Sequence, residues 1–312
     1  MAGNPGQNGE LRIQDWLNLA RQRLADAAAR SLAGQYDSEG LGEEPEAVDI
    51  LREAGFEAQI LAAHGLEKPR SWIIAHPETP LTTDHQARLD DLLDRRASGT
   101  PLPYVLGHWA FYGLDFEISP AVLIPRPETE LLVERALDWL NTRPGSRTAD
   151  VGTGSGCIAV SLLKHNPDVR VITVDRSWEA LQIARRNAAR HGVEGRAAFL
   201  QGDLLTALRG PLDLVCANLP YIPEGSLPSL QVARHEPHLA LDGGPDGLNA
   251  IRALIEDAPR WLAPGGLLLL EMQYDQGEAI VAMAQTFLPG SRTTVVPDLA
   301  GLPRVIEIAR AA

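Results

Sequence analysis

Apolar side chains in the first hundred residues recur at the three- and four-residue spacing of an amphipathic helix. The clearest case follows a Thr-Thr-Asp start signal and places Leu89, Leu92 and Leu93 on one face. We therefore expect residues 1–100 to form an all-helical domain behind a polar tail of residues 1–10. Its helices are predicted at residues 11–30, 47–54, 56–64, 71–76 and 83–97.

Residues 31–46 interrupt the helical pattern. The slightly wider stretch 31–50 holds six acidic residues and neither Lys nor Arg, and it also contains glycines. Charge of one sign together with glycine is typical of a solvated loop. We expect an acidic loop or insertion over residues 31–46.

The character of the chain changes at residues 99–103, which are rich in proline. Residues 104–119 alternate and are rich in aromatic side chains, with Gly113 near the middle, which predicts a β-hairpin. We assign residues 101–122 to a hairpin linker. Prolines and acids over residues 125–130 then predict the start of an amphipathic helix that continues to Leu140.

From Arg147 onward, short apolar runs alternate with stretches of helical periodicity. This is the rhythm of a doubly wound parallel sheet, so the expected fold class is α/β, with a Rossmann-like domain over residues 123–312. Strands are predicted at residues 147–151, 169–174, 197–200, 212–217, 266–271, 293–296 and 304–309. Helices are predicted at residues 157–165, 177–191, 248–262 and 275–287.

Composition sharpens this picture in three ways. The 312 residues are 45% hydrophobic, which suits a packed protein of two domains and excludes wholesale disorder. The net charge of −13 argues against non-specific binding to nucleic acid, which requires a basic surface. There is no secretory pattern in residues 1–10 and no membrane-spanning run, so we expect a cytoplasmic protein with two reduced cysteines, Cys157 and Cys216.

A glycine-rich turn follows the first predicted strand of the α/β domain. It reads Asp150-Val-Gly152-Thr153-Gly154-Ser155-Gly156 and leads into a helix. Glycines at such a turn let the backbone approach a ligand, and the helix N-terminus offers free N–H groups. The G-x-G-x-G spacing differs from the dinucleotide pattern, and Asp150 is placed to engage a positively charged amino group. Both features favour S-adenosylmethionine as the cofactor.

Two acidic positions after the next strands complete the expected cofactor site. Asp175 ends the second strand, where a carboxylate accepts hydrogen bonds from both ribose hydroxyls. Asp203 and Leu204 follow the third strand, and we expect them to meet the adenine amino group and ring.

The fourth strand ends in Asn218-Leu219-Pro220-Tyr221, which resembles the N-P-P-Y motif of methyltransferases that modify a planar nitrogen. An amide nitrogen is a poor nucleophile because its lone pair is delocalised. An Asn oxygen and a backbone carbonyl that accept its two N–H bonds hold it in line with the methyl group, and an aromatic ring packs on the plane. Leu219 replaces the family's proline but keeps the carbonyl, and it precedes Pro220, which favours extended backbone.

Four further segments carry a more specific signal: residues 104–113, 123–130, 236–248 and 298–304. With the strand-end motif they resemble, from about residue 47 to the end, the PrmC/HemK family of N(5)-glutamine methyltransferases of peptide chain release factors. The Arg-Pro-Glu-Thr-Glu form of residues 126–130 favours this branch over the related ribosomal-protein glutamine methyltransferases.

The resemblance implies a class I methyltransferase domain, a hairpin linker and a helical N-terminal domain that helps to recognise the release factor. The implied reaction methylates the glutamine of the release factor's Gly-Gly-Gln motif and leaves S-adenosylhomocysteine. It implies cofactor contacts at residues 152–156, Asp175, Asp203, Leu204 and Asn218. Arg126 and Glu130 match family positions near the active site.

Alternatives from other classes remain open. They are a ribosomal-protein glutamine methyltransferase, an adenine amino-methyltransferase of nucleic acid, an NAD-dependent oxidoreductase and a non-enzymatic binding module. The net charge, the G-x-G-x-G spacing and the intact motif residues argue against the last three. No metal site is expected, because His235 and His238 have no third ligand in view and are separated by Pro237. We expect release factors as partners, without direct contact to nucleic acid or membrane.

Overall fold

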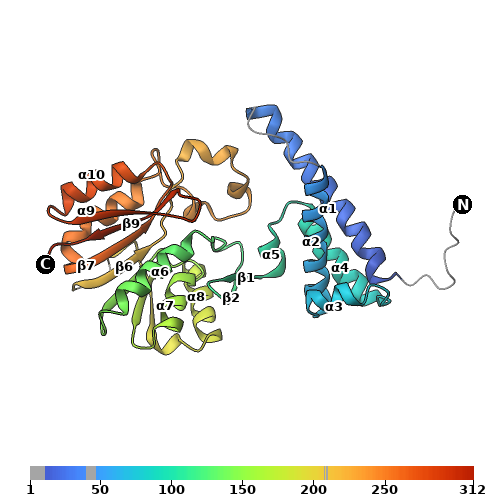
Figure 1. Ribbon diagram of the computed structural model, residues 1–312, viewed down its shortest axis with the longest axis horizontal. Helices are drawn as coiled ribbons and strands as arrows, with labels where there is room; N and C mark the ends of the chain where they lie inside the picture. The colour runs from blue at the N-terminus through green and yellow to red at the C-terminus, as the bar shows by residue number, and fades with distance from the viewer. Residues whose placement is uncertain (1–10, 40–46, 207, 209) are drawn as a thin grey trace, which may run out of the picture. The chain divides into compact units, whose positions relative to one another are not determined.

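The computed structural model describes residues 11–39, 47–206, 208 and 210–312 (Figure 1). The chain divides into two compact units, and the division falls between Leu106 and Gly107. The first unit is helical and the second is an α/β unit. Among the described residues, no helix is long and apolar enough to cross a membrane.

The helical unit packs through apolar side chains on facing helices. Its helices are α1 (Ile13–Glu39), α2 (Ala47–Leu66), α3 (Arg70–Ala75), α4 (Thr83–Ala97) and α5 (Leu102–Leu106). Trp16 and Leu61 are fully buried between them. Helices α2 and α4 come close at Gly65, where a β-carbon would lie 2.4 Å from Leu89 Cδ2. The predicted start of α4 is confirmed, because the Thr82 hydroxyl accepts a hydrogen bond from His85 N.

Three local predictions in this half of the chain are wrong. Helix α1 runs through Glu39, so residues 31–39 are not a loop; residues 40–46 lie outside the described residues. A helix that is already nucleated gains one hydrogen bond for each residue added, which favours this extension. Helix α2 is unbroken at Gly55. Residues 104–106 belong to α5, because the Pro101 carbonyl accepts from Tyr104 N and starts a helical turn.

The hairpin is shorter than predicted and begins at residue 108. Its strands, β1 (His108–Phe111) and β2 (Leu114–Glu117), are antiparallel, with Phe111 opposite Leu114. The two turn residues, Tyr112 and Gly113, have φ of 49° and 72°. Positive φ at both positions matches the twist of the strands in a two-residue turn.

The α/β unit is built on a mixed sheet, which confirms the predicted fold class. Among the described residues it has seven strands in the order β5-β4-β3-β6-β7-β9-β8, of which β9 is antiparallel to its neighbours. The order reverses between β3 and β6. The strands are β3 (Arg147–Val151), β4 (Arg170–Asp175), β5 (Ala197–Gln201), β6 (Leu212–Ala217), β7 (Leu262–Glu271), β8 (Arg292–Pro297) and β9 (Pro303–Ala309).

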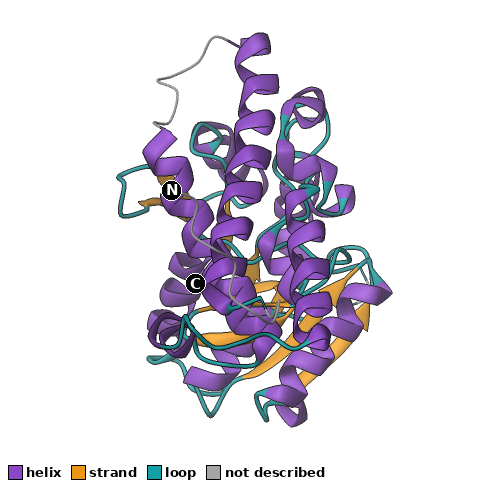
Figure 2. Ribbon diagram, turned by 90° about the vertical axis from the view of Figure 1, so that its right-hand side faces the viewer, coloured by secondary structure: helices purple, strands orange, loops and turns teal. Residues whose placement is uncertain are grey.

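Helices cover both faces of this sheet (Figure 1). One layer contains α6 (Thr129–Leu140), α7 (Cys157–His165) and α8 (Trp178–Arg190); the other contains α9 (Asn249–Trp261) and α10 (Gly277–Phe287). Figure 2 shows the strands as one layer flanked by helices. Short 3-10 helices are η1 (Glu194–Arg196), η2 (Glu224–Ser229), η3 (Gln231–Arg234) and η4 (His238–Ala240).

Helix α6 begins four residues later than predicted. Pro125 and Pro127 disfavour helical geometry at the residues before them, so the chain stays irregular until Thr129. This irregular stretch is what lines part of the cavity described next.

Candidate active site

A cavity of about 670 Å³ opens at the carboxyl ends of β3 and β6. The strand order reverses between these two strands, and ligands of doubly wound sheets bind at such a reversal. The volume lies in the range of small-molecule sites. The walls come from the glycine-rich turn, the ends of β4 and β6, the segments near residues 121–129 and 237–253, and the turn after β5.

The glycine-rich turn lies between β3 and α7. Gly152, Gly154 and Gly156 have φ of 71°, 55° and 81°, values that side chains rarely adopt. A β-carbon on Gly156 would lie 3.0 Å from the Ala184 β-carbon, so glycine there lets α7 and α8 pack closely. Thr153 and Ser155 also line the cavity.

Asp150 lies beneath this turn and is not among the residues that line the cavity. It is fully buried, and its Oδ2 accepts from Thr153 Oγ1 at 2.5 Å and from Ala159 N at 3.3 Å. Its Oδ1 has no partner among the described residues. Burial raises the pKa of this carboxyl to about 7. In this arrangement Asp150 supports the turn from below.

Asp175 ends β4 beside the same turn. Its Oδ2 accepts from Gly154 N at 2.8 Å and its Oδ1 from Ser177 N at 2.9 Å. Burial raises its pKa, and the backbone N–H donors oppose that shift. A carboxylate has about four acceptor positions, so these backbone bonds do not use up its capacity to accept from a ligand hydroxyl.

Asp203 and Leu204 both line the cavity after β5. The Asp203 side chain is mostly exposed and forms a loose ion pair with Arg176 at 3.7 Å. Leu204 has a φ of 48°, an unusual backbone conformation for a side chain of its size. The structure therefore brings the predicted cofactor residues together, with Asp150 as the exception.

The strand-end motif follows β6 directly. Asn218, Leu219 and Pro220 line the cavity. Leu219 is buried, and its Cδ2 would lie 3.1 Å from a β-carbon on Gly152, so it packs onto the glycine-rich turn. No described residue donates a hydrogen bond to Asn218 Oδ1 or to the Leu219 carbonyl.

Tyr221 is the one motif residue that does not line the cavity. It is half-buried, and its hydroxyl donates to Glu271 Oε1 at 3.3 Å. The Tyr221 carbonyl accepts from Gln276 Nε2 at 2.9 Å. Both ends of this residue are therefore tied to the segment that begins at the end of β7.

Thr129 and Glu271 were missed by sequence reasoning. Asn218 Nδ2 donates to Thr129 Oγ1 at 3.0 Å, and Thr129 Oγ1 donates to Glu271 Oε2 at 2.6 Å. Burial raises the pKa of Glu271 to about 7. The sequence does contain a signal for Glu271. It is a charged residue that ends the apolar run 266–270, and the end of that strand lies at the same sheet edge as Asp175 and Asn218.

Arg126 and Glu130, which the resemblance places near the active site, have different surroundings. Arg126 lines the cavity and forms an ion pair with buried Glu236 at 2.5 Å; Glu236 also accepts from Ile124 N. Glu130 accepts from Tyr112 N and so holds the hairpin turn. Arg126 thus belongs to the cavity wall, whereas Glu130 anchors the hairpin.

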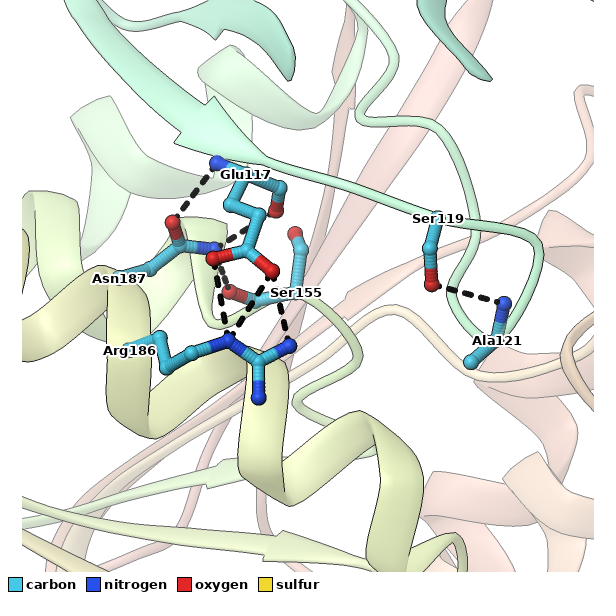
Figure 3. Close-up of polar contacts among 6 residues, drawn as sticks. All are labelled: Glu117, Ser119, Ala121, Ser155, Arg186 and Asn187. Carbon is cyan, nitrogen blue, oxygen red and sulfur yellow. Dashed lines mark hydrogen bonds and ion pairs between the residues drawn. The ribbon is translucent and has the colours of Figure 1, made fainter. Parts of the chain in front are cut away.

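Asn187 on α8 connects the hairpin to the glycine-rich turn (Figure 3). Its Nδ2 donates to the carbonyls of Glu117 and Ser155, both at 2.9 Å, and its Oδ1 accepts from Glu117 N at 2.7 Å. The Glu117 carboxylate also forms an ion pair with Arg186. Residues 121–123, which follow β2 in the chain, line the cavity, as does the glycine-rich turn. Asn187 therefore ties the segment that leads to one part of the cavity wall to another part, the glycine-rich turn.

Cys157 also lines the cavity, at the first turn of α7. Burial raises the pKa of its thiol to about 12. In the part of the chain that the structure describes, no three His, Cys, Asp or Glu side chains gather in a way that could hold a metal ion.

Two family profiles match the chain. The PrmC N-terminal domain matches residues 46–107, and the methyltransferase small domain matches residues 128–234. The release factor glutamine methyltransferase of Moorella thermoacetica is 42% identical over 286 residues, which cover 91% of this chain and 96% of that protein. The protein of the same name from Nitratidesulfovibrio vulgaris is 39% identical over 311 residues, which cover 97% of each.

Two solved structures show a weaker similarity to the chain. A methyltransferase from Pyrococcus furiosus has a TM-score of 0.48 at 18% identity and covers 65% of this chain and 92% of its own. The 16S rRNA N2 G1207 methyltransferase from T. thermophilus, solved with AdoMet and guanosine, has a TM-score of 0.48 at 17% identity and covers 65% of this chain and 49% of its own.

Proposed function

We propose that this chain, which belongs to the release factor glutamine methyltransferase family, methylates a glutamine side-chain amide in a peptide chain release factor. The membership confirms the family resemblance of the sequence. The acceptor we propose is the glutamine of the release factor's Gly-Gly-Gln motif.

S-adenosylmethionine fits the cavity. In the turn of residues 152–156, the three glycines have no β-carbon, so the backbone can come close to a ligand. The N-terminus of α7 lies behind this turn. Asp175 keeps acceptor capacity and would accept from the ribose hydroxyls, and Asp203 and Leu204 would face the adenine. Asp150 would act on the methionyl group only indirectly, through the turn that it supports. Asn218 would contact the cofactor at the place where S-adenosylmethionine meets the glutamine substrate.

The residues after β6 would hold the glutamine amide. Asn218 Oδ1 and the Leu219 carbonyl are acceptors without a partner among the described residues, and they would accept the two amide N–H bonds. Pro220 keeps Leu219 extended. Tyr221, expected from the sequence to pack against the amide plane, lies outside the cavity lining and donates its hydroxyl to Glu271, so it would act by fixing the chain after Pro220. Holding nucleophile and methyl group in line supplies most of the acceleration in reactions of this kind.

When bound, S-adenosylmethionine would supply a sulfonium-activated methyl group for transfer to the amide nitrogen, with the electron pair of the broken carbon–sulfur bond left on sulfur and an amide proton released to water. Asn218 and Leu219 orient the nitrogen lone pair toward that carbon by accepting both N–H bonds.

We assign substrate recognition to an N-terminal domain of residues 1–100, joined by residues 101–122 to the transferase at 123–312. The PrmC N-terminal domain profile supports this role. We propose a cytoplasmic enzyme that does not bind nucleic acid directly. The net charge of −13 and the absence of Lys and Arg between Leu212 and Ala233 favour a protein acceptor.

The observation that carries this proposal is the pair of unpartnered acceptors, Asn218 Oδ1 and the Leu219 carbonyl, beside the glycine-rich turn. The test is mass spectrometry of purified release factors after incubation with the chain and S-adenosylmethionine. We expect a mass gain of one methyl group on the Gly-Gly-Gln glutamine. Methylation of nucleic acid with none on the release factor would contradict the proposal.

A further inference from the structure

We propose that Glu271 and Thr129 are positioning residues that set which atom of the Asn218 amide faces the substrate. This inference rests on the proposed function, because it concerns the acceptor that would hold the glutamine amide. It assigns to both residues a role that is exerted through Asn218.

The three side chains form a series at one edge of the sheet. Strands β6 and β7 are parallel neighbours with Ala217 opposite Leu270, so Asn218 and Glu271 follow at the same level. Thr129, the first residue of α6, lies between them, 3.0 Å from Asn218 Nδ2 and 2.6 Å from Glu271 Oε2. Thr129 and Glu271 are each 1% exposed, so water cannot substitute for either partner.

The direction of these hydrogen bonds follows from the chemistry of the groups. An ionised carboxylate only accepts, and a threonine hydroxyl has one proton to donate. Glu271 therefore takes the Thr129 proton, and Thr129 Oγ1 is left as an acceptor toward Asn218. Only the NH₂ end of the Asn218 amide can face it, so Oδ1 turns to the cavity, where an N–H donor of the substrate would meet an acceptor.

Tyr221 gives the carboxylate a second fixed donor. Its hydroxyl donates to Glu271 Oε1, and burial together with the Glu271 charge raises the pKa of Tyr221, so the proton stays on the phenol. The same carboxylate thus orients the two motif residues on either side of Leu219 and Pro220.

Protonation of Glu271 would remove this constraint, because a carboxylic acid can donate to Thr129 and let the Thr129 proton turn toward Asn218. The pKa of Glu271 is about 7, raised by burial and the nearby Glu128 carboxylate, and lowered by Thr129, Tyr221 and Arg304. Cys157 on α7 also faces it, as a neutral thiol. Turnover is therefore expected to rise with pH through about 7.

The test compares Glu271→Gln and Thr129→Val with Thr129→Ser and with a matched control, Thr148→Val. Thr148 in β3 is a buried threonine whose hydroxyl has no partner among the described residues. We expect kcat on the release factor to fall about 10-fold to 100-fold in the first two variants, as for loss of one hydrogen bond to a charged group. Thr129→Ser and the control should stay within about 3-fold of wild type, and cofactor affinity, measured by calorimetry, should hold in all variants. The acid limb of kcat near neutral pH should disappear in Glu271→Gln.

Either of two results would overturn the inference: kcat within about 3-fold of wild type in Glu271→Gln and Thr129→Val, or a loss of cofactor binding that accounts for the fall in kcat. Failure of the proposed function is distinguishable, since wild type would then leave every release factor unmodified. Nitrogen-15 NMR of the Asn218 side-chain amide reads the orientation without substrate. We expect slowly exchanging, hydrogen-bonded NH₂ protons in wild type and faster exchange in Glu271→Gln; equal exchange overturns the inference.

Discussion

The two units differ most in the kind of side chain that they bury. Within the described residues, the buried polar and charged side chains all lie in the α/β unit, from Thr129 to Gln276. The helical unit buries apolar side chains, and ion pairs such as Arg23–Asp94 and Arg88–Glu67 lie at its surface, whereas Arg96–Glu57 is partly buried.

This difference separates side chains that serve stability from side chains that serve a site. A buried polar group destabilises a fold unless it is fully hydrogen-bonded, and a buried carboxylate more so. Asp150 and Glu271 nevertheless lie under the cavity and beside its wall. The α/β unit therefore tolerates unfavourable burial of carboxylates where they orient groups of the site. Variants in the two units can test this difference.

The largest effect is expected at the cavity itself. Asn218→Ala removes the amide acceptor and should lower turnover by about 10³-fold, the upper range for loss of one catalytic hydrogen-bonding group. Cofactor affinity should change little. The measurements are methyl incorporation into a release factor and calorimetry with S-adenosylmethionine; Asn141→Ala, at the exposed end of α6, is the control. Wild-type-like turnover would contradict the mechanism.

Asn187→Ala should give the largest loss of stability. It removes three hydrogen bonds between α8, the hairpin and the glycine-rich turn, and leaves buried backbone groups unpaired (Figure 3). We expect the free energy of unfolding to fall by about 2–4 kcal/mol in urea titrations, with Asn141→Ala again as control. A change below about 1 kcal/mol would show that water or neighbours replace these bonds.

Asp175→Ala should act on affinity more than on turnover. It removes the acceptors for the ribose and the partners of Gly154 N and Ser177 N, so cofactor affinity should fall about 10-fold to 100-fold in calorimetry. Asp203→Ala, at an exposed acid on the same cavity, should have a smaller effect. An equal loss of cofactor affinity in both variants would contradict the idea that the buried carboxylate contributes more to cofactor binding than the exposed one.

Asp150→Asn should change the pH dependence of stability. The folded pKa of about 7 lies above the unfolded value near 4, so the folded state binds the proton more tightly and stability falls as pH rises between them. The variant should reduce that slope by up to about 1.4 kcal/mol per pH unit. Urea unfolding between about pH 4.5 and 8 measures it, with the Glu271 contribution remaining. An unchanged slope would contradict the assignment.

The smallest effect is expected in the helical unit. Arg23→Ala breaks an exposed ion pair with Asp94 and should change the free energy of unfolding by less than about 1 kcal/mol. Urea unfolding of the full chain measures this. A larger loss would mean that surface charge contributes more to this unit than its burial pattern indicates.

The sheet, most helix positions and the cavity-lining turn could be predicted because their signals are local. Gly152, Gly154 and Gly156 mark their turn by spacing alone, and Asn218 follows a readable strand. The pairing of Thr129 with Glu271 could not be read, because 142 residues separate them and only the strand order brings them together. Asp150 was placed next to the ligand because it adjoins the turn, but its side chain lies beneath that turn.

The errors at α1 and α5 have a different origin. Glycines and acids near residue 34 favour a loop by composition, yet cooperative extension of a long helix outweighs a weak local preference. At α5, alternation of apolar residues imitates a strand, while Pro101 and Pro103 favour a helical turn. When a short segment carries mixed signals, the segments next to it in the chain decide whether it forms a helix, a strand or a loop.

The Cys157 thiol has a consequence for covalent chemistry. An electrophilic ligand aimed at this cavity would meet a sulfur in reach, because the residue forms part of the wall. Burial raises the pKa of this thiol to about 12, so little of the thiolate, which is the reactive form, is present at neutral pH. Burial therefore disfavours alkylation and oxidation of the thiol at this position.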